Sequence, residues 1–321
     1  MLLTEAIDAL CMATRADGRS ARTVESYRQK LAALLTFLGD VPVEMITVDD
    51  LRHYIADLMD RRILYAVHPS RKQVKGALSP FTVASNVRAC RRLFNWLEEE
   101  GRIETSPMRR IRTPQPRRRE PKGISRQNLL ALLKSTGAGS VADLRDRAII
   151  LFLADTGCRV GGLCGLLVGD VDLDSKLAVL VEKGGKTRRA PFTRTTARAL
   201  QEWLAVRPQD KGPALFVGLG NRAKDTVTPT GMARMLTRRA KQAAITGPVN
   251  PHSFRHAFAR DFLLDGGDLG TLADLLGHTS VLVTKDFYGI FTIQELQEKH
   301  ARHSPIAQIF QDRDEQKDRT G

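Results

Sequence analysis

Apolar positions in the N-terminal part of the chain repeat at the spacing of an α-helix. One such face is formed by four leucines: Leu31, Leu34, Leu35 and Leu38. Because residues at i, i+3, i+4 and i+7 lie on one side of a helix, this run predicts a helix that Gly39 ends. A second helix is expected from Ser79 as cap, through Pro80 in its first turn, to Gly101. Its apolar side consists of Val83, Val87, Phe94 and Leu97.

A different mixture of patterns begins at Ile124. Leu177–Val181 is typical of a strand, Gly184 and Gly185 of a turn, and Arg189–Phe192 of the return strand. Helical patterns surround this hairpin: a helix capped by Ser125 that runs to Leu133, Leu144–Ala154 ended by Gly157, Thr195–Val206, Thr230–Ala244, Ser253–Leu264 and Leu269–Leu276. The sequence therefore predicts a mainly α fold with a small antiparallel β-sheet in the C-terminal domain.

The two regions are joined by a basic, proline-rich segment, residues 109–122. Its seven basic side chains stand against the single acid Glu120: Arg109, Arg110, Arg112, Arg117, Arg118, Arg119 and Lys122. Such self-repelling sequence with three prolines stays extended and packs no core. We therefore predict a helical domain at 1–111, a linker at 112–123, and a second domain at 124–321 whose tail begins at about residue 301.

The chain as a whole is strongly basic. Over 321 residues the formal net charge is +14, and the isoelectric point is near 10.0. A surface of this charge suits a polyanion, with nucleic acid first and an anionic membrane surface second, although some basic proteins are merely soluble. The linker is expected to lie along phosphates, or to be a simple soluble tether.

Three further features concern the compartment. The longest strictly apolar run, Ala148 to Ala154, is far shorter than the roughly 20 residues of a membrane-spanning helix. The N-terminus has no basic region followed by an apolar stretch, as a signal peptide would. The four cysteines show no CxxC spacing, so we expect reduced thiols, no metal site and a cytoplasmic protein.

The polar residues of the second domain are weak indicators when each is taken alone. Arg159 follows a helix-ending glycine, and Lys183 lies at the predicted hairpin turn, where surface residues are common. His252 and Arg255 are one turn apart on a helix. His252 and His256 have a spacing that suits zinc, but no acidic or cysteine third ligand lies nearby in the sequence.

The order of these residues along the chain is more informative. Arg159, Lys183, His252, Arg255, His278 and Tyr288 occur in the order of the catalytic residues of the tyrosine recombinases. The surrounding motifs agree: Leu144–Ala148 leading into Asp155–Arg159, Glu182–Arg188, Pro251–Ala259 and Leu275–Ser280. The chain resembles this phage integrase family over nearly its whole length. The resemblance implies a core-binding domain at 1–111, a catalytic domain at 124–321, and a C-shaped clamp of the two around DNA.

The resemblance also implies a role for each residue. Tyr288 would attack a DNA phosphodiester and form a 3′-phosphotyrosyl bond, and Lys183 would protonate the leaving 5′ oxygen. Arg159 and Arg255 would stabilise the phosphate charge, because a guanidinium fork matches phosphate geometry. His252 would accept a proton and His278 would donate a hydrogen bond. No cofactor or metal is expected, because the covalent bond retains the energy of the cleaved one.

Two positions depart from the family pattern. Family members usually carry an acid three residues after the first arginine, where this chain has Gly162. The commonest family spacing would place the nucleophile at Phe287, whereas Tyr288 lies ten residues after His278. Thr284–Gly289 fits the variant with the longer spacing, so we predict Tyr288 as the nucleophile.

The function expected from these residues is site-specific recombination through a Holliday junction. The partners would be duplex DNA and further copies of the chain, a dimer on each site and a tetramer in all, with a paralogous recombinase as an option; the protein would be cytoplasmic and nucleoid-associated. Two alternatives stay open: DNA relaxation like that of type IB topoisomerases, and a DNA-binding protein impaired in catalysis, which Gly162 makes conceivable. Predicted DNA contacts are Arg88, Arg91, Arg92, Arg117, Arg118, Arg119 and Lys122.

Overall fold

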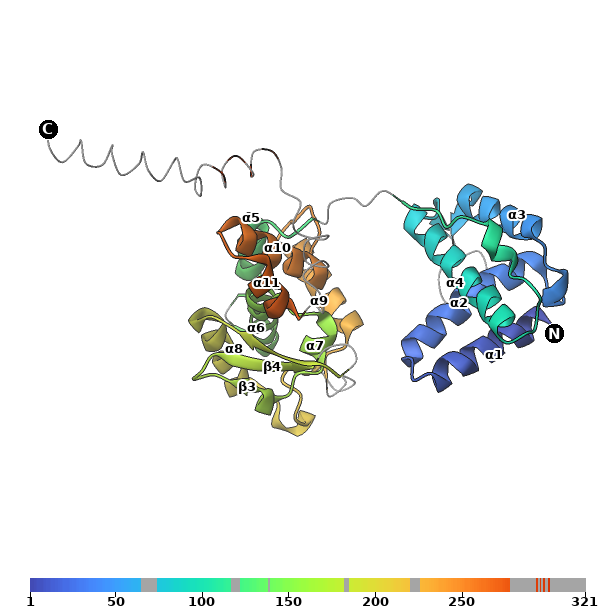
Figure 1. Cartoon of the computed structure of the whole chain (residues 1–321). Helices are drawn as coiled ribbons and strands as arrows, with labels where there is room; N and C mark the ends of the chain where they lie inside the picture. The colour runs from blue at the N-terminus through green and yellow to red at the C-terminus, as the bar shows by residue number, and fades with distance from the viewer. Residues whose placement is uncertain are drawn as a thin grey trace, which may run out of the picture. The chain divides into compact units, whose positions relative to one another are not determined.

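The computed structural model describes residues 1–64, 74–116, 122–137, 139–181, 185–219 and 226–277, together with the single residues 293, 295, 297 and 300. The chain divides into two compact units, Met1–Arg119 and Glu120–Gly321 (Figure 1). Each unit has its own hydrophobic core.

In its described residues, 1–64 and 74–116, the first unit contains four α-helices. They are α1 (Leu3–Ala16), α2 (Ala21–Leu38), α3 (Val48–Asp60) and α4 (Pro80–Glu99). A two-stranded antiparallel sheet pairs β1 (Ile63–Leu64) with β2 (Val74–Lys75), and two 3-10 turns span Val43–Met45 and Pro107–Arg110. Helix α4 contacts α1, α2 and α3, so the core gathers around it. Phe94 of α4 and Tyr54 of α3 are fully buried there.

The predicted ends of two of these helices are confirmed. Ser79 accepts a hydrogen bond from the Thr82 amide at 3.1 Å, and Pro80 opens α4. Gly39 follows α2 with a φ of 76°, a conformation that glycine adopts without strain. Helices α1 and α3 were expected only as part of a helical region, without limits of their own.

The second unit combines seven helices, within the described residues, with one small sheet. The helices are α5 (Arg126–Lys134), α6 (Val141–Thr156), α7 (Val160–Cys164), α8 (Arg194–Val206), α9 (Pro229–Gln242), α10 (Pro251–Leu264) and α11 (Leu269–Leu276). The strands are β3 (Val171–Asp172), β4 (Leu177–Val181) and β5 (Thr187–Pro191), antiparallel in that order. The predicted fold class, mainly α with a small antiparallel sheet, is confirmed.

The sheet alternates between a core face and an outer face. Ala178 and Leu180 of β4 are fully buried, whereas Val179 and Val181 are exposed. Strand β4 and helix α11 have the predicted limits, and the return strand β5 begins two residues before the expected Arg189. Gly184 of the predicted turn lies outside the described residues.

Helix α6 is the central helix of this unit. It contacts α5, α8 and α10, and the apolar run that begins at Ala148 forms its middle. Ala148, Ile149, Ile150, Phe152 and Leu153 are all buried. A helix that is apolar on most of its circumference is covered on most sides, so this run marks the core of the unit.

No helix in the described part of the chain is both long enough and apolar enough to cross a membrane. Of the predicted linker, residues 112–116 and 122–123 have neither helix nor strand, and residues 117–121 lie outside the described ranges. Where the chain enters the second unit, it lies against α10: the Ile124 amide donates to the Ser253 carbonyl at 3.0 Å. A Cβ on Gly123 would stand 2.8 Å from the Ala257 amide nitrogen, so the close approach requires glycine there.

Candidate active site

The end of helix α6 positions Arg159. Thr156 donates its hydroxyl to the Phe152 carbonyl at 2.7 Å, and Gly157 then turns the chain with a left-handed φ of 55°. A Cβ on Gly157 would lie 2.8 Å from Phe258 Cδ1 and 3.0 Å from a Leu276 methyl carbon. The turn therefore requires glycine twice, for its conformation and for its packing. Two residues later Arg159, half-buried, stands at the N-cap position of α7.

Helix α10 supplies the second predicted arginine. Asn250 caps the helix through the Ser253 amide, and Pro251 occupies its first turn. Arg255 is only 4% exposed and donates hydrogen bonds to the Gly157 carbonyl at 2.9 Å and to the Leu276 carbonyl at 2.8 Å. Its side chain therefore touches the main chain just before Arg159.

Of the other predicted side chains, the structure describes His252. His252 is exposed, one turn before Arg255 on α10. Gly277 ends α11 in the left-handed conformation, with φ 64°, directly before His278. His278, Lys183 and Tyr288 lie outside the described residues. The described parts thus bring together the end of α6, the start of α10 and the end of α11, the three elements next to Arg159, Arg255 and His278.

Strand β5 joins this group through an arginine that the sequence did not single out. Arg188 donates one Nη to the Leu275 carbonyl and the other to the Thr156 carbonyl at 3.4 Å. Burial lowers the pKa of its guanidinium. The only sequence indication was its place at the end of the motif Glu182–Arg188, and the motif gave no distance to either helix end.

The position of the missing acid is buried but not crowded. A Cβ on Gly162 would meet the Val181 carbonyl oxygen at 3.6 Å and Leu180 carbons from 3.8 Å, which are ordinary contacts. The carboxylate of Asp155, near the end of α6, accepts from the Thr193 amide at 2.6 Å and from the Thr196 hydroxyl. Asp155 thereby ties the end of α6 to the start of α8.

Burial also affects two titratable groups of this region. It raises the pKa of the Cys158 thiol, which is fully buried, so this cysteine stays protonated. Burial first, and then the charges of His252 and Arg255, lower the pKa of His256. Among the described residues, no three His, Cys, Asp or Glu side chains are grouped to hold a metal ion.

The predicted DNA-contacting arginines of α4 have different surroundings. Arg88 is exposed, and Arg92 forms an ion pair with Glu99 at 3.2 Å. Arg91 is half-buried and donates to the carbonyls of Met108 and Ile111 and to the Thr113 hydroxyl. Its guanidinium therefore ties α4 to the segment that follows it, a structural role that the predicted DNA contact did not include.

Of the predicted contacts in the linker, Lys122 is exposed, and Arg117, Arg118 and Arg119 lie outside the described residues. Beyond Tyr288, the described residues Ile293, Glu295, Gln297 and His300 are helical, and an ion pair joins Arg260 of α10 to Glu295. The predicted tail from about residue 301 lies outside the described ranges.

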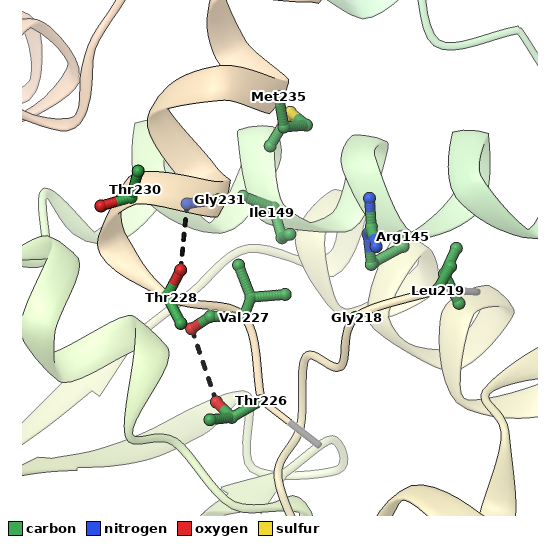
Figure 2. A pocket seen from close by; sticks show the side chains of 10 residues that line it. All are labelled: Arg145, Ile149, Gly218, Leu219, Thr226, Val227, Thr228, Thr230, Gly231 and Met235. Carbon is green, nitrogen blue, oxygen red and sulfur yellow. Dashed lines mark hydrogen bonds between the residues drawn. The ribbon is translucent and has the colours of Figure 1, made fainter. Parts of the chain in front are cut away.

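A pocket of about 570 Å³ lies in the second unit, next to the start of α9 (Figure 2). Its lining consists of Arg145, Ile149, Gly218, Leu219, Thr226, Val227, Thr228, Thr230, Gly231 and Met235. Thr228 caps α9 here by accepting from the Gly231 amide at 3.1 Å. None of the predicted catalytic residues that the structure describes lines this pocket.

Comparisons with known proteins agree with this arrangement. The family model described as "Phage integrase family" matches residues 123–290. The chain is 32% identical to tyrosine recombinase XerD of Mycobacterium leprae, over 90% of this chain and 92% of that protein. It is 30% identical to tyrosine recombinase XerC of Alcanivorax borkumensis, over 92% of each. The Tn1549 transposon integrase in complex with a circular intermediate DNA has the same fold, with a TM-score of 0.70 and 17% identity, covering 92% of this chain and 98% of that one.

The chain therefore belongs to the phage integrase family, the tyrosine recombinases, which are enzymes of site-specific DNA recombination. The predicted family and enzyme class are confirmed, and DNA is the partner of the chain.

Proposed function

We propose that the second unit cleaves and rejoins duplex DNA with Tyr288 as nucleophile, and that the first unit helps to bind the recombination site. The observation that carries the proposal is the position of Arg255, buried between the end of α6, which leads to Arg159, and the end of α11, which leads to His278. We propose that Arg159 acts beside Arg255, because a pair of guanidinium groups matches the geometry and charge of a phosphate diester.

In the cleavage step the phenolic oxygen of Tyr288 attacks the phosphorus, and the bond from phosphorus to the 5′ oxygen breaks. His252 accepts the phenolic proton and Lys183 donates one to the leaving 5′ oxygen, so charge is balanced. Negative charge that develops on the non-bridging oxygens is stabilised by Arg159, Arg255 and the His278 ring. In the reverse step the 5′ hydroxyl of another strand attacks the phosphorus and gives its proton to Lys183. The bond from phosphorus to the phenolic oxygen breaks, and His252 returns a proton to Tyr288, which completes the exchange.

Recombination between two duplexes requires four cleaved strands, so we propose a dimer on each site and a tetramer in the complex, formed with copies of this chain or with a paralogous recombinase. Such a complex would act in the cytoplasm, on the chromosome. The basic linker and the exposed Arg88 and Lys122 support DNA binding beyond the active site.

Trapping the covalent intermediate tests the proposal. The cognate site is first identified by sequencing the fragments that the protein retains from a genomic DNA library. Duplexes of that site carry a nick a few nucleotides to the 3′ side of the cleavage position. The short fragment with the new 5′ hydroxyl then diffuses away, and the phosphotyrosyl adduct is trapped. We expect wild-type adducts that resist denaturing electrophoresis and none with Tyr288→Phe, which keeps the ring but lacks the hydroxyl.

The same substrates separate the alternatives. Tight binding of the cognate duplex without any adduct would favour the DNA-binding protein impaired in catalysis. Adducts with relaxation of supercoiled plasmid but no exchanged strands would favour the topoisomerase-like reaction. Adducts regained by Phe287→Tyr in the Tyr288→Phe protein would move the nucleophile to position 287.

A further inference from the structure

Arg188 lies on the core face of the small sheet, toward the candidate active site. In the β4–β5 register it pairs with the fully buried Leu180, and residues opposite each other on antiparallel strands share a face. The next residue, Arg189, pairs with the exposed Val179 on the outer face and is itself exposed. The two neighbouring arginines thus have the same charge and opposite surroundings.

The contacts of Arg188 repeat those of Arg255 one residue earlier on each helix end. Arg188 donates to the carbonyls of Thr156 and Leu275, whereas Arg255 donates to the carbonyls that follow them in the chain. Two guanidinium groups, from β5 and from α10, therefore bridge the ends of α6 and α11 in register.

Gly277 provides the space for the Arg188 side chain. A Cβ on Gly277 would stand 2.8 Å from Cδ of Arg188, and Gly277 also has the left-handed φ of 64°. The glycine before His278 is therefore required both to end α11 and to admit the Arg188 side chain.

The electrostatics favour arginine at this position. The last carbonyls of a helix lack partners within the helix and carry the negative end of its dipole. Two such ends meet at the candidate active site, and each receives donors from Arg188 and Arg255. A planar guanidinium presents several donors in a fixed geometry, so one side chain satisfies a carbonyl on each helix.

We propose that Arg188 is a positioning residue for DNA cleavage. It fixes the ends of α6 and α11 relative to each other and thereby sets the spacing of Arg159, Arg255 and His278 around the phosphate. It also links this spacing to the β4–β5 hairpin, in which Lys183 precedes β5. When the Arg255 guanidinium engages the phosphate, the Arg188 bridge keeps the helix ends in register. This inference rests on the proposed function, because it concerns the geometry of the same site.

The test compares Arg188→Met with Arg189→Met, which removes the same charge from the opposite face of the same strand. Single-turnover cleavage of the nicked cognate duplex is measured with the full-length enzyme at saturating concentration, and DNA affinity is measured separately. Misplacing reacting groups by about 1 Å costs on the order of 100-fold in rate, so we expect a loss of that size for Arg188→Met. The dissociation constant should stay within about threefold of the wild-type value, and Arg189→Met should cleave at nearly the wild-type rate.

Circular dichroism and thermal unfolding establish that each variant is folded. If Arg188→Met does not fold, Arg188→Lys decides: its shorter side chain and single ammonium cannot reproduce the fork, so we expect cleavage at least about tenfold slower, in line with the strict geometry of such sites. Cleavage at the wild-type rate by folded Arg188→Met or folded Arg188→Lys would overturn the inference. A loss of rate that is fully explained by a loss of DNA affinity would overturn it as well. Absence of Tyr288-dependent adducts in the wild-type protein would instead overturn the proposed function.

Discussion

At the scale of single residues, we expect His256 to make the stability of the second unit depend on pH below about 6.5. Its pKa is lowered by burial and by the neighbouring His252 and Arg255, so the folded state favours the neutral imidazole. The unfolded chain, in which a histidine titrates near pH 6.5, binds more protons over the interval below that value. Stability therefore rises with pH across this interval and is lost as pH falls from about 6.5 toward the lowered folded pKa.

The prediction is that His256→Gln flattens this pH dependence. The measurement is the urea midpoint of the second unit between pH 5 and pH 8, read from hydrogen-exchange protection in peptides of α6 and α10. His53→Gln, which removes an exposed imidazole from α3, serves as the control and should leave the dependence unchanged. An equal pH dependence of stability in the wild-type protein and in His256→Gln would show that His256 is not its source.

Residue patterns supplied candidate side chains more readily than the contacts that those side chains make. Arg159, His252 and Arg255 were proposed from their order and motifs, and the glycine-ended helices before Arg159 and His278 were predicted from local spacing. The bridging role of Arg188 was not predictable, because it depends on the distance between two helix ends that are far apart in sequence. For the same reason Arg91 was expected on DNA, whereas its guanidinium binds backbone carbonyls of its own unit.

At the scale of elements, a buried carboxylate joins α6 to α9. Asp146 is fully buried and accepts from Arg145 at 2.7 Å, Arg238 at 2.8 Å and Arg239 at 2.9 Å. Arg239 is itself buried and also binds Asp143 at 2.7 Å. Removing one partner of a buried ion pair leaves the other charge uncompensated, at a cost of about 3–5 kcal/mol. We expect Asp146→Asn to lower the free energy of unfolding of this unit by about 3 kcal/mol, with the loss of protection concentrated in α6 and α9.

The matched control is Glu202→Gln, which breaks the exposed ion pair with Arg198 on α8. Such surface pairs contribute about 0.3–0.5 kcal/mol, so the two variants should differ clearly in urea unfolding followed by hydrogen exchange. Similar losses for both variants would mean that the Asp146 cluster is as weakly coupled as a surface pair.

The limits of helices and strands were predictable from the sequence where a clear capping residue or a helix-ending glycine was present. Strand β4 and helix α11 were predicted with their observed limits, and α2 and α6 end at the expected glycines, whereas α4 ends two residues before the expected Gly101. The short helix α7 was missed, because Val160–Cys164 contains two glycines and has too few residues for a periodic pattern. Its position is fixed by tertiary contacts with β4 and α9, which no local signal reveals.

At the scale of the whole molecule, two hydrophobic cores and a basic segment between them were readable from composition. Each core comes from long helices with clear apolar faces, and almost half of the excess positive charge falls in residues 109–122 between them. Proline and like charges disfavour a compact segment, so this boundary needed no long-range information.

We predict that the positive charge of the linker contacts DNA phosphates. If Arg117, Arg118 and Arg119 contact phosphates, each contact releases counterions on binding, and the slope of log affinity against log salt concentration steepens by about 0.9 per contact. Replacing all three by glutamine should then weaken binding to cognate and unrelated duplexes alike and flatten the slope by roughly 0.9 for each lost contact. Fluorescence anisotropy over a salt series measures both effects.

Arg194→Gln with Arg198→Gln is the control, since both arginines are exposed on α8 and their loss lowers the net charge outside the linker. We expect the slope of this control to stay close to the wild-type value, because general attraction at long range is screened within about 10 Å at 0.1 M salt. A slope unchanged by the linker substitutions would make the segment a tether, and the net charge of +14 would then act on DNA through the two folded units. A slope that falls equally in both variants would point to overall charge rather than to phosphate contacts of the linker.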